Sequence, residues 1–323
     1  MSNANSNTTA KTAELPLGVS RNGQGMDKLN LIERFGRLVV RAFSHLPLKV
    51  LYLFSDVVYF LLYWVVGYRL KVVRKNLKIV FPEKTDKERR HIERRFYRHL
   101  SDYFFETIKA LTISDEELMS RMKIRNPEVV GNLLDEGRSV FLYAPHLGNW
   151  EWFTNVPLLY PGKEVHAFYQ KQGNRFANYI SLEVRTRRNI AAVEGHRGFR
   201  YTYECIRDGI NSVTLVIGDQ CPHRTAQKIW LPFCGQDTPF LAGPEHIARK
   251  LGVALVYPSF VAYRRGYYEV EFQVLALNPK ELPEHECTRR FATLIEEDLH
   301  RLPELWLWSH KRWKLKHENF PNE

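Results

Sequence analysis

The strongest constraint on the fold is an alternation of short apolar runs with helical segments between Asn126 and Leu302. Apolar runs of this kind, rich in β-branched and aromatic residues, have the length of buried strands. They occupy residues 139–144, 165–169, 190–193, 212–217 and 252–257. Strands that alternate with helices build parallel sheets. We therefore predict an α/β fold with a largely parallel central sheet flanked by helices.

The chain divides into three parts by composition. Residues 1–25 are polar and rich in Ser, Asn and Thr, and we expect a disordered tail there. Residues 26–85 form an N-terminal helical region that we expect to associate with a membrane. Residues 86–323 form the α/β domain, which opens with a long charged helix over 86–109 and closes with an amphipathic helix over 284–302. An alternating segment at 267–275 predicts a half-exposed edge strand.

Two segments of the N-terminal region suggest a membrane. In 29–43, apolar residues recur at helical spacing with arginines between them, which is typical of a basic interfacial helix or of a surface helix packed on a domain. Segment 50–66 carries one charge, Asp56, and is at the short limit for crossing a bilayer. Basic residues follow it, so a spanning helix would leave the rest of the chain cytoplasmic. Spanning, lying in the interface and forming a buried core helix all remain open.

The net charge of +11 indicates an anionic partner, which could be nucleic acid, a membrane surface or a phosphorylated lipid. The four cysteines form no CxxC pair, so we expect free thiols in a reducing compartment.

His146 stands where the apolar run 139–144 ends. A turn through Gly148 and Asn149 follows, and Asn149 is a candidate helix N-cap that would put Glu151 in the first turn. Glu151 would then orient His146, which would act as a general base. With 12 histidines and 36 acidic residues in 323 positions, one such pair arises by chance, so a purely structural histidine remains an alternative.

Other polar residues could share this site. Asp219 follows the run 212–217, and neighbouring parallel strands bring their carboxyl ends to one rim, although Asp219 could instead cap a turn. Arg185, Arg187 and Arg188 crowd the end of a helix and could be solvated or could clamp a phosphate. The chain has no GxSxG, HExxH, P-loop or GxGxxG motif, so we expect direct transfer to a substrate hydroxyl.

The segment 303–314, PELWLWSHKRWK, combines three tryptophans with basic residues. Such a segment could stack on single-stranded nucleic acid or lie at a membrane interface.

Taken together, these stretches resemble the late acyltransferases of lipid A biosynthesis, within the glycerolipid acyltransferase superfamily. The resemblance covers residues 46–314. It is carried by the HX4E box at His146 and by the order of the motifs that follow it. These are Asn76-Leu77 with Phe81-Pro82, Tyr169 leading to Arg185-Thr186-Arg187, Asp219-Gln220, Pro232-Phe233-Cys234-Gly235 with Thr238, and PELWLWSHKRWK.

The resemblance implies transfer of a fatty acyl chain from acyl carrier protein to a hydroxyl of a lipid A precursor, at the cytoplasmic face of the inner membrane. It implies no metal and no cofactor. His146 and Glu151 would be catalytic, and the substrate-binding residues would be Arg185, Arg187, Asp219 and Asn149. The expected partners are acyl carrier protein, an anionic lipid acceptor and the membrane, not nucleic acid.

Two departures from the family pattern leave the acceptor and the acyl chain open. Tyr169-Gln170-Lys171 stands where the family has Tyr-Arg-Pro, and Cys234 replaces a Phe. An aminolipid or a lysophospholipid is the alternative acceptor. A non-catalytic basic protein that binds membrane or nucleic acid is a more remote alternative.

Overall fold

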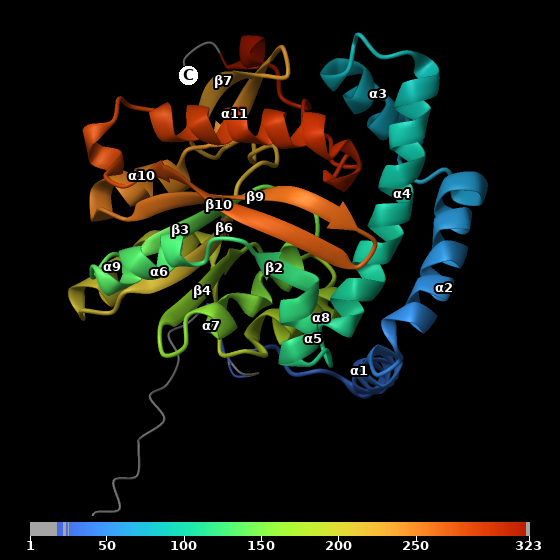
Figure 1. Ribbon diagram of the computed structural model, residues 1–323, viewed down its shortest axis with the longest axis horizontal. Coiled ribbons are helices and arrows are strands. Elements are labelled where there is room, and N and C mark those ends of the chain that lie inside the picture. The colour runs from blue at the N-terminus through green and yellow to red at the C-terminus, as the bar shows by residue number, and fades with distance from the viewer. Residues whose placement is uncertain (1–17, 22–23, 25, 321–323) are drawn as a thin grey trace, which may run out of the picture.

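The computed structural model describes residues 18–21, 24 and 26–320 of the 323-residue chain. At its centre is an eight-stranded sheet in the order β1-β5-β4-β6-β3-β9-β10-β2 (Figure 1). The strands are β1 Val19–Ser20, β2 Met122–Ile124, β3 Val140–Ala144, β4 Glu164–Tyr169, β5 Ala191–Glu194, β6 Ser212–Ile217, β9 Ala254–Arg264 and β10 Tyr267–Ala276. From β5 to β9 every adjacent pair is parallel. The predicted largely parallel α/β sheet is therefore confirmed.

Strand β10 does not lie at the edge of the sheet, contrary to the prediction from its alternating pattern. It pairs antiparallel with β9 and parallel with β2, so the three-residue β2 forms that edge. A hairpin that the sequence did not predict is formed by β7 Lys228–Phe233 and β8 Gln236–Leu241. Its turn is formed by Cys234 and Gly235, whose φ angles of 51° and 68° are those of a tight hairpin turn.

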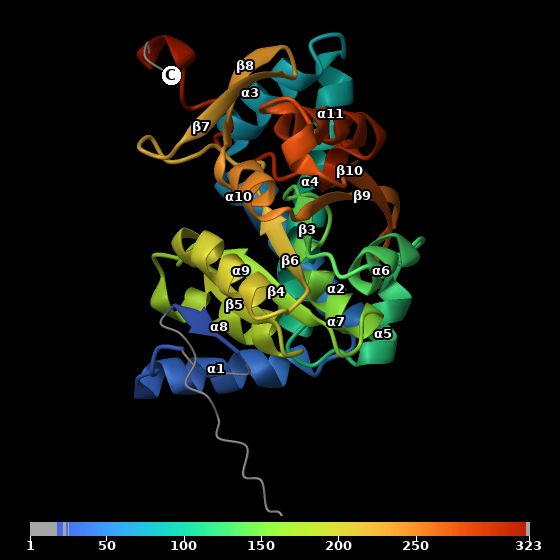
Figure 2. The same cartoon turned by 90° about the vertical axis from the view of Figure 1, so that its left-hand side faces the viewer.

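Helices cover the sheet and extend along one side of it. They are α1 Leu31–Ser44, α2 Leu48–Phe60, α3 Leu70–Val80, α4 Asp86–Lys109, α5 Asp115–Arg121, α6 Glu128–Asp135, α7 Val156–Leu159, α8 Arg175–Thr186, α9 Gly198–Arg207, α10 Gly243–Leu251 and α11 Glu286–Arg301. A π-helical segment, η1 (Leu61–Val66), continues α2. The long helix α4 runs along one side of the domain with α2 on its outer side (Figure 1). Figure 2 shows α3 and the β7–β8 hairpin at one end of the molecule and α1 at the other.

Local sequence explains where α4 begins. Thr85 accepts a hydrogen bond from the Glu88 backbone, and the Glu88 side chain accepts one from the Thr85 backbone. This capping box satisfies backbone donors at the helix start and fixes the beginning of α4 at the predicted residue.

The hydrophobic core is continuous across residue 85. One cluster of buried side chains includes Leu51 of α2 and Leu77 of α3 together with Phe96 of α4 and the residues of β3. Residues 1–17, 22–23 and 25 of the predicted disordered tail lie outside the described residues, but Val19–Ser20 form β1, which pairs with β5. The helices α1 to α3 are therefore part of the same packed body as the sheet.

Candidate active site

The sheet brings His146 and Asp219 to the same rim. Strands β3 and β6 are adjacent and parallel, and Ala144 of β3 is paired with Ile217 of β6. Each polar residue follows two positions after its paired strand end, so register alone makes them neighbours. Asp219 Oδ1 lies 2.6 Å from His146 Nδ1. Asp219 therefore lies beside His146, as strand order predicted, and its role in binding substrate stays a prediction.

Asp219 is held as a carboxylate. Its side chain is buried, and its second oxygen accepts a hydrogen bond of 2.7 Å from Trp306 Nε1. Burial opposes ionisation, but the charge and hydrogen bond of His146 and the hydrogen bond of Trp306 outweigh it, so the pKa of Asp219 lies below its ordinary value. An ionised carboxylate only accepts hydrogen bonds, so Nδ1 of His146 carries the hydrogen and neutral His146 has its lone pair on Nε2.

Nε2 of His146 is free to act. The His146 side chain is 19% exposed, and no residue in the described part of the chain hydrogen-bonds this nitrogen. The imidazole packs edge to face against Trp150, with ring centroids 5.0 Å apart, and Trp150 packs in turn on Tyr103. An imidazole fixed by a carboxylate on one nitrogen and open on the other has the arrangement of a general base.

The C-terminal segment 303–314 forms one wall of this site. Leu147 and Trp306 form an antiparallel bridge, Gly148 N donates to Leu305 O, and Leu307 N donates to His146 O. The tryptophans of this segment are buried: Trp306, Trp308 and Trp313. The two suggested uses of these rings, stacking on nucleic acid or lying at a membrane interface, are therefore wrong, because the rings pack in the core and one of them orients Asp219.

Glu151 does not orient His146, contrary to the prediction. Asn149 does cap the following 3₁₀ helix, η2 (Trp150–Asn155), by accepting from Trp152 N at 3.2 Å, so Glu151 lies in the first turn as predicted. Its two carboxylate oxygens accept hydrogen bonds from Arg185 of α8, at 2.9 Å from Nε and 2.5 Å from Nη2. Glu151 thus forms a buried ion pair with another predicted site residue, and Asp219 takes its place beside the imidazole. Whether Glu151 takes part in catalysis remains a prediction.

Asn149 and Arg187 both hold neighbouring parts of the chain together, and their contact with substrate stays a prediction. Asn149 is fully buried, and its Nδ2 donates to Glu106 Oε2 at 2.7 Å. Arg187 donates from Nη1 to Ala110 O and Ile113 O, at the carboxyl end of α4, where orphan carbonyls need donors. The neighbouring Arg188 pairs with Asp115, so the three arginines do not form a clamp.

A family model described as bacterial lipid A biosynthesis acyltransferase matches residues 29–315. This chain belongs to that family. It is 22% identical over 250 residues to the lipid A biosynthesis palmitoleoyltransferase of Escherichia coli K12, covering 77% of this chain and 79% of the relative. A lipid A biosynthesis acyltransferase of Shigella flexneri matches equally. The lipid A biosynthesis lauroyltransferase of Escherichia coli K12 is 22% identical over 264 residues, covering 79% and 82% of the two chains. The family resemblance inferred from the motifs is confirmed.

In this acyltransferase the sequence did not indicate a fully buried arginine, Arg312, whose charge interacts with that of Asp219. Its side chain is 1% exposed, and its three guanidinium nitrogens have no hydrogen-bond partner among the described residues. The guanidinium lies over the Phe240 ring at 4.5 Å, a cation–π contact. Burial lowers the pKa of Arg312 to about 10, and the charge of Asp219 opposes that shift. Nothing in the spacing of HKRWK indicated which of its basic residues would be buried.

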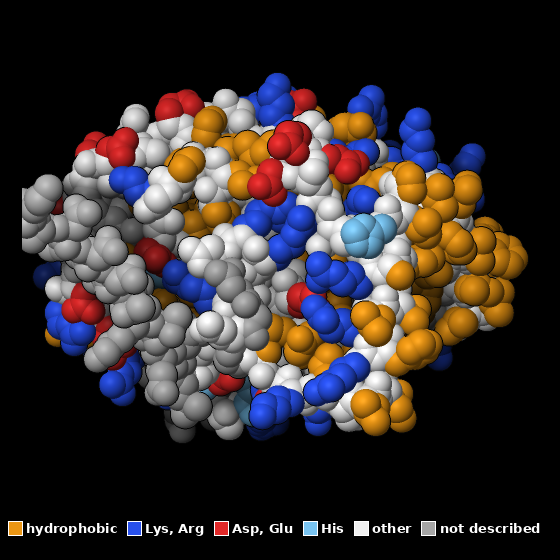
Figure 3. All heavy atoms as spheres, turned by 90° about the horizontal axis from the view of Figure 1, so that it is seen from below, with side chains coloured by type: hydrophobic (Ala, Val, Ile, Leu, Met, Phe, Trp, Pro, Cys, Tyr) orange, Lys and Arg blue, Asp and Glu red, His pale blue; other side chains and the backbone are white. Residues whose placement is uncertain are grey.

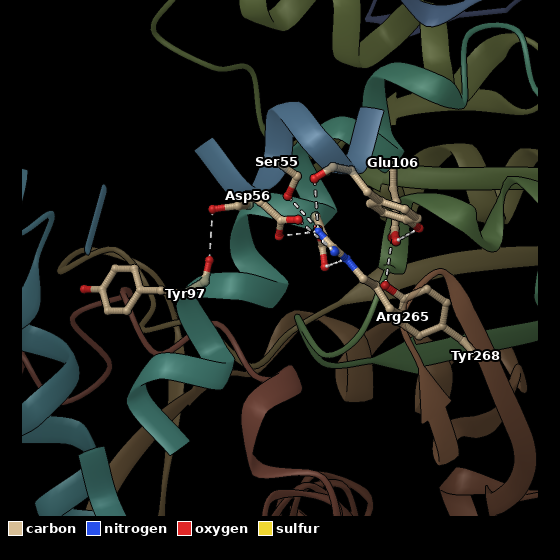
Figure 4. A network of polar contacts seen from close by, with 9 residues as sticks. Ser55, Asp56, Tyr97, Glu106, Arg265 and Tyr268 are labelled. Carbon is tan, nitrogen blue, oxygen red and sulfur yellow. Dashed lines mark hydrogen bonds and ion pairs between the residues drawn. The ribbon is translucent and has the colours of Figure 1, made fainter. Parts of the chain in front are cut away.

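The candidate site is also connected to α2 through a second residue that the sequence did not indicate, Glu106 of α4. Its carboxylate accepts hydrogen bonds from Tyr52 of α2, from Tyr268 of β10 and from Asn149 at the site. Burial raises the pKa of Glu106 to about 6. Figure 4 shows Tyr268 pointing to Glu106, and Arg265 beside Ser55 and Asp56. The described residues contain no group of three or more His, Cys, Asp or Glu side chains that could hold a metal ion.

Proposed function

We propose that this protein is a membrane-bound O-acyltransferase that moves a fatty acyl chain from acyl carrier protein to a hydroxyl of a lipid A precursor, with His146 as general base. The observation that carries the proposal is the hydrogen bond between Asp219 and His146 Nδ1, which leaves Nε2 free at the end of β3. The chemistry needs a proton acceptor of this kind, because a neutral hydroxyl is a weak nucleophile toward a thioester.

The proposed reaction is a direct displacement. Nε2 of His146 removes the proton of the acceptor hydroxyl as its oxygen attacks the thioester carbonyl carbon. The C–S bond then breaks, the ester forms, and the carrier thiolate takes the proton back from His146 and leaves as a thiol. Asp219 stabilises the imidazolium that exists between these steps, because its carboxylate faces Nδ1 in a buried environment.

Arg185 is the group that we propose for binding the anionic part of the acceptor. Its side chain is 21% exposed, whereas that of Glu151 is almost completely buried. Glu151 holds the guanidinium through two hydrogen bonds, which leaves the remaining guanidinium hydrogens for an acceptor phosphate. The lipid A acceptor itself is proposed from family membership and from the names of the three relatives.

An exposed apolar surface supports the proposed attachment to a membrane. We call it the apolar surface, and it consists of the outward residues of α1, α2 and η1: Leu31, Ile32, Phe35, Leu38, Val39, Leu53, Phe54, Val57, Phe60, Leu61, Trp64, Val65 and Val66. In α1 the polar side is turned inward, since Arg37 pairs with Glu183 of α8 while Leu31 is 82% exposed. Figure 3 shows apolar side chains gathered over one end of the molecule with lysines and arginines beside them. Contiguous apolar surface of this kind marks a binding site.

The test is transfer of a labelled acyl chain from acyl carrier protein to a tetra-acylated lipid A precursor by the detergent-solubilised protein. We expect the wild type to acylate the precursor. The acyl-transfer activity of His146→Ala should be at least roughly 100-fold lower, which is the scale for removal of a general base. His91→Ala, on the exposed side of α4, is the matched control and should retain activity. Transfer to a lysophospholipid or an aminolipid, but not to the precursor, would refute the proposed acceptor, and full activity of His146→Ala would refute the proposed base.

A further inference from the structure

We infer that the apolar helix Leu48–Val66 lies in the plane of an anionic membrane surface, along the side of the catalytic domain, and does not cross the bilayer. The inference rests on the proposed membrane attachment and specifies its geometry. The helix is 19 residues long and apolar enough to span a membrane by length and composition. Sequence alone left both arrangements open, but the contacts of its inner face distinguish them.

The inner face of this helix is bonded to α4 by polar side chains. Ser55 donates to Asp102 at 2.5 Å, Tyr52 donates to Glu106 at 2.7 Å, and Tyr63 donates to Glu93 at 2.9 Å. All three carboxylates are buried. A helix that left α4 to enter hydrocarbon would expose its own hydroxyls to lipid and leave these carboxylates with fewer donors, and polar groups without partners are unfavourable in both places.

An ion pair holds the middle of the helix to the sheet. Arg265, in the turn between β9 and β10, pairs with Asp56 at 2.8 Å and with Asp102 at 2.7 Å (Figure 4). Asp56 is the single charged residue within 50–66 and would lie near the bilayer centre in a spanning helix. In the observed arrangement the negative charge of Asp56 is paired with the guanidinium of Arg265.

Both ends of the helix are attached to the same body. Before it, Lys109 Nζ donates to the carbonyls of Ser44 and Leu46. After it, Arg69 donates to Ser309 O and Asn76 donates to Trp308 O, in the C-terminal segment. A spanning helix has its ends on opposite faces of a hydrocarbon layer about 30 Å thick. A spanning arrangement is incompatible with the observed contacts, because both ends of the helix are attached to one domain and the arginine-rich helix α4 lies along its inner face.

The outer face fits an anionic lipid surface. It presents the apolar surface, including Trp64 at 60% exposure, and basic side chains lie at both ends of the helix: Lys49, Arg69, Lys71 and Lys75. Apolar insertion combined with flanking positive charge is the pattern of helices that lie at the head-group boundary of anionic membranes. The net charge of +11 acts in the same direction.

Nitroxide depth measurements test the inference. Leu53, Val57 and Leu61 lie one helical turn apart on the exposed face. Each would be changed to Cys and spin-labelled in the full-length protein, bound to vesicles of phosphatidylethanolamine and phosphatidylglycerol, with the labelled wild type as background. For a helix in the plane we expect the three labels at one shallow depth. A spanning helix would instead give depths that change by about 6 Å from each position to the next, which would overturn the inference.

Topology gives a second, independent readout. We would label His45→Cys and Lys71→Cys, on either side of the helix, with a membrane-impermeant maleimide in spheroplasts and in lysed cells. We expect neither to react in intact spheroplasts and both to react after lysis, whereas reaction of one alone in spheroplasts would overturn the inference. Recovery of the full-length protein in the soluble fraction, or a dimer that covers the apolar surface in place of lipid, would refute the membrane attachment as well, while leaving the acyl transfer assay unaffected.

Discussion

Asp219 and His146 are 73 positions apart in sequence and are joined by a hydrogen bond of 2.6 Å, which the parallel pairing of β3 with β6 makes possible. The contact defines the tautomer of the imidazole, and it makes the carboxylate of Asp219, rather than the HX4E glutamate, the group that orients the proposed base.

Asp219→Asn should therefore remove most of the activity without unfolding the protein. An amide can donate to Nδ1 and thereby move the imidazole hydrogen to Nε2, where it blocks proton removal. We expect kcat for acyl transfer to fall roughly 100- to 10,000-fold with little change in Tm. Trp306→Phe leaves the Asp219 carboxylate in place, so its kcat should fall less than that of Asp219→Asn. A similar loss in both variants would indicate that packing of the C-terminal segment, and not the tautomer, limits the rate.

Glu151→Met should destabilise the protein because it leaves the guanidinium of Arg185 largely buried and unpaired. Arg185 retains some exposure, so we expect a loss of about 2–3 kcal/mol in the free energy of unfolding. The double variant Glu151→Met, Arg185→Met should recover most of that stability but not the activity, since Arg185 is the proposed contact with the acceptor. Urea unfolding and acyl transfer would be measured on the same preparations. An active double variant would exclude Arg185 from substrate binding.

Asn76→Ala should loosen the C-terminal segment from α3. Asn76 Nδ2 donates to the carbonyls of Trp308 and His310, at 2.8 Å each, and the side chain is buried. We expect a loss of about 2 kcal/mol in stability. A fall in kcat should accompany it, because Trp306 of the same segment hydrogen-bonds Asp219. The neighbouring exposed Lys75→Ala is the control, and a kcat unchanged in Asn76→Ala would show that the segment is positioned without α3.

Stability should decrease as the pH falls from about 6.5 to about 4, and His99 should account for part of the decrease. Burial lowers the pKa of His99 to about 4, against a hydrogen bond to Gly148 O that opposes the shift. Its Nδ1 is buried without a partner among the described residues, so a second hydrogen there would find no acceptor. Between these pH values His99 is protonated in the unfolded chain but not in the folded protein. The free energy of unfolding therefore falls by about 3 kcal/mol by pH 4.

The measurement is unfolding by urea as a function of pH. His99→Gln retains a donor for Gly148 O and should flatten the dependence between these pH values. The exposed His91→Gln on the same helix should leave it unchanged. His310, whose pKa burial also lowers to about 4, should maintain a remaining slope in His99→Gln. A His99→Gln profile parallel to that of the wild type would refute this role for His99.

Charges placed on the apolar surface should weaken membrane binding and leave the fold intact. Val57→Glu with Leu61→Glu removes two exposed apolar side chains of α2 and η1, each contributing about 2 kcal/mol when inserted. We expect sedimentation with phosphatidylglycerol vesicles to weaken at least roughly 10-fold, with Tm unchanged. Phe199→Glu with Tyr203→Glu on α9 is the control, because it adds the same two charges at exposed residues outside the apolar surface. Equal weakening by this control would mean that net charge alone governs binding.

The parallel sheet and the nearness of Asp219 to His146 could be predicted because both follow from strand order and register, but the sequence pointed to Glu151 as the partner of the imidazole. The direction of individual side chains could not be predicted. Spacing predicts Glu151 in the first turn of a helix, as observed. It does not predict that Arg185 of α8 donates hydrogen bonds to the Glu151 carboxylate. The pattern of 86–109 predicts a charged helix, as observed, but its composition does not indicate the inner face on which Asp102 and Glu106 are buried. A buried charge is identified by the groups around it, and those come from distant segments.

Glu106 joins Tyr52 of the apolar helix to Asn149, in the turn of the candidate site, through one carboxylate. The N-terminal helices are therefore not a detachable anchor. Deleting α1 and α2 to obtain a detergent-free enzyme would remove the Tyr52 donor of Glu106 and so disturb Asn149, the cap that precedes Glu151. It would also leave Arg265 without Asp56 and Asp102 without Ser55. Expression of a catalytic fragment that begins at α4 should give inactive protein for reasons unrelated to its access to lipid.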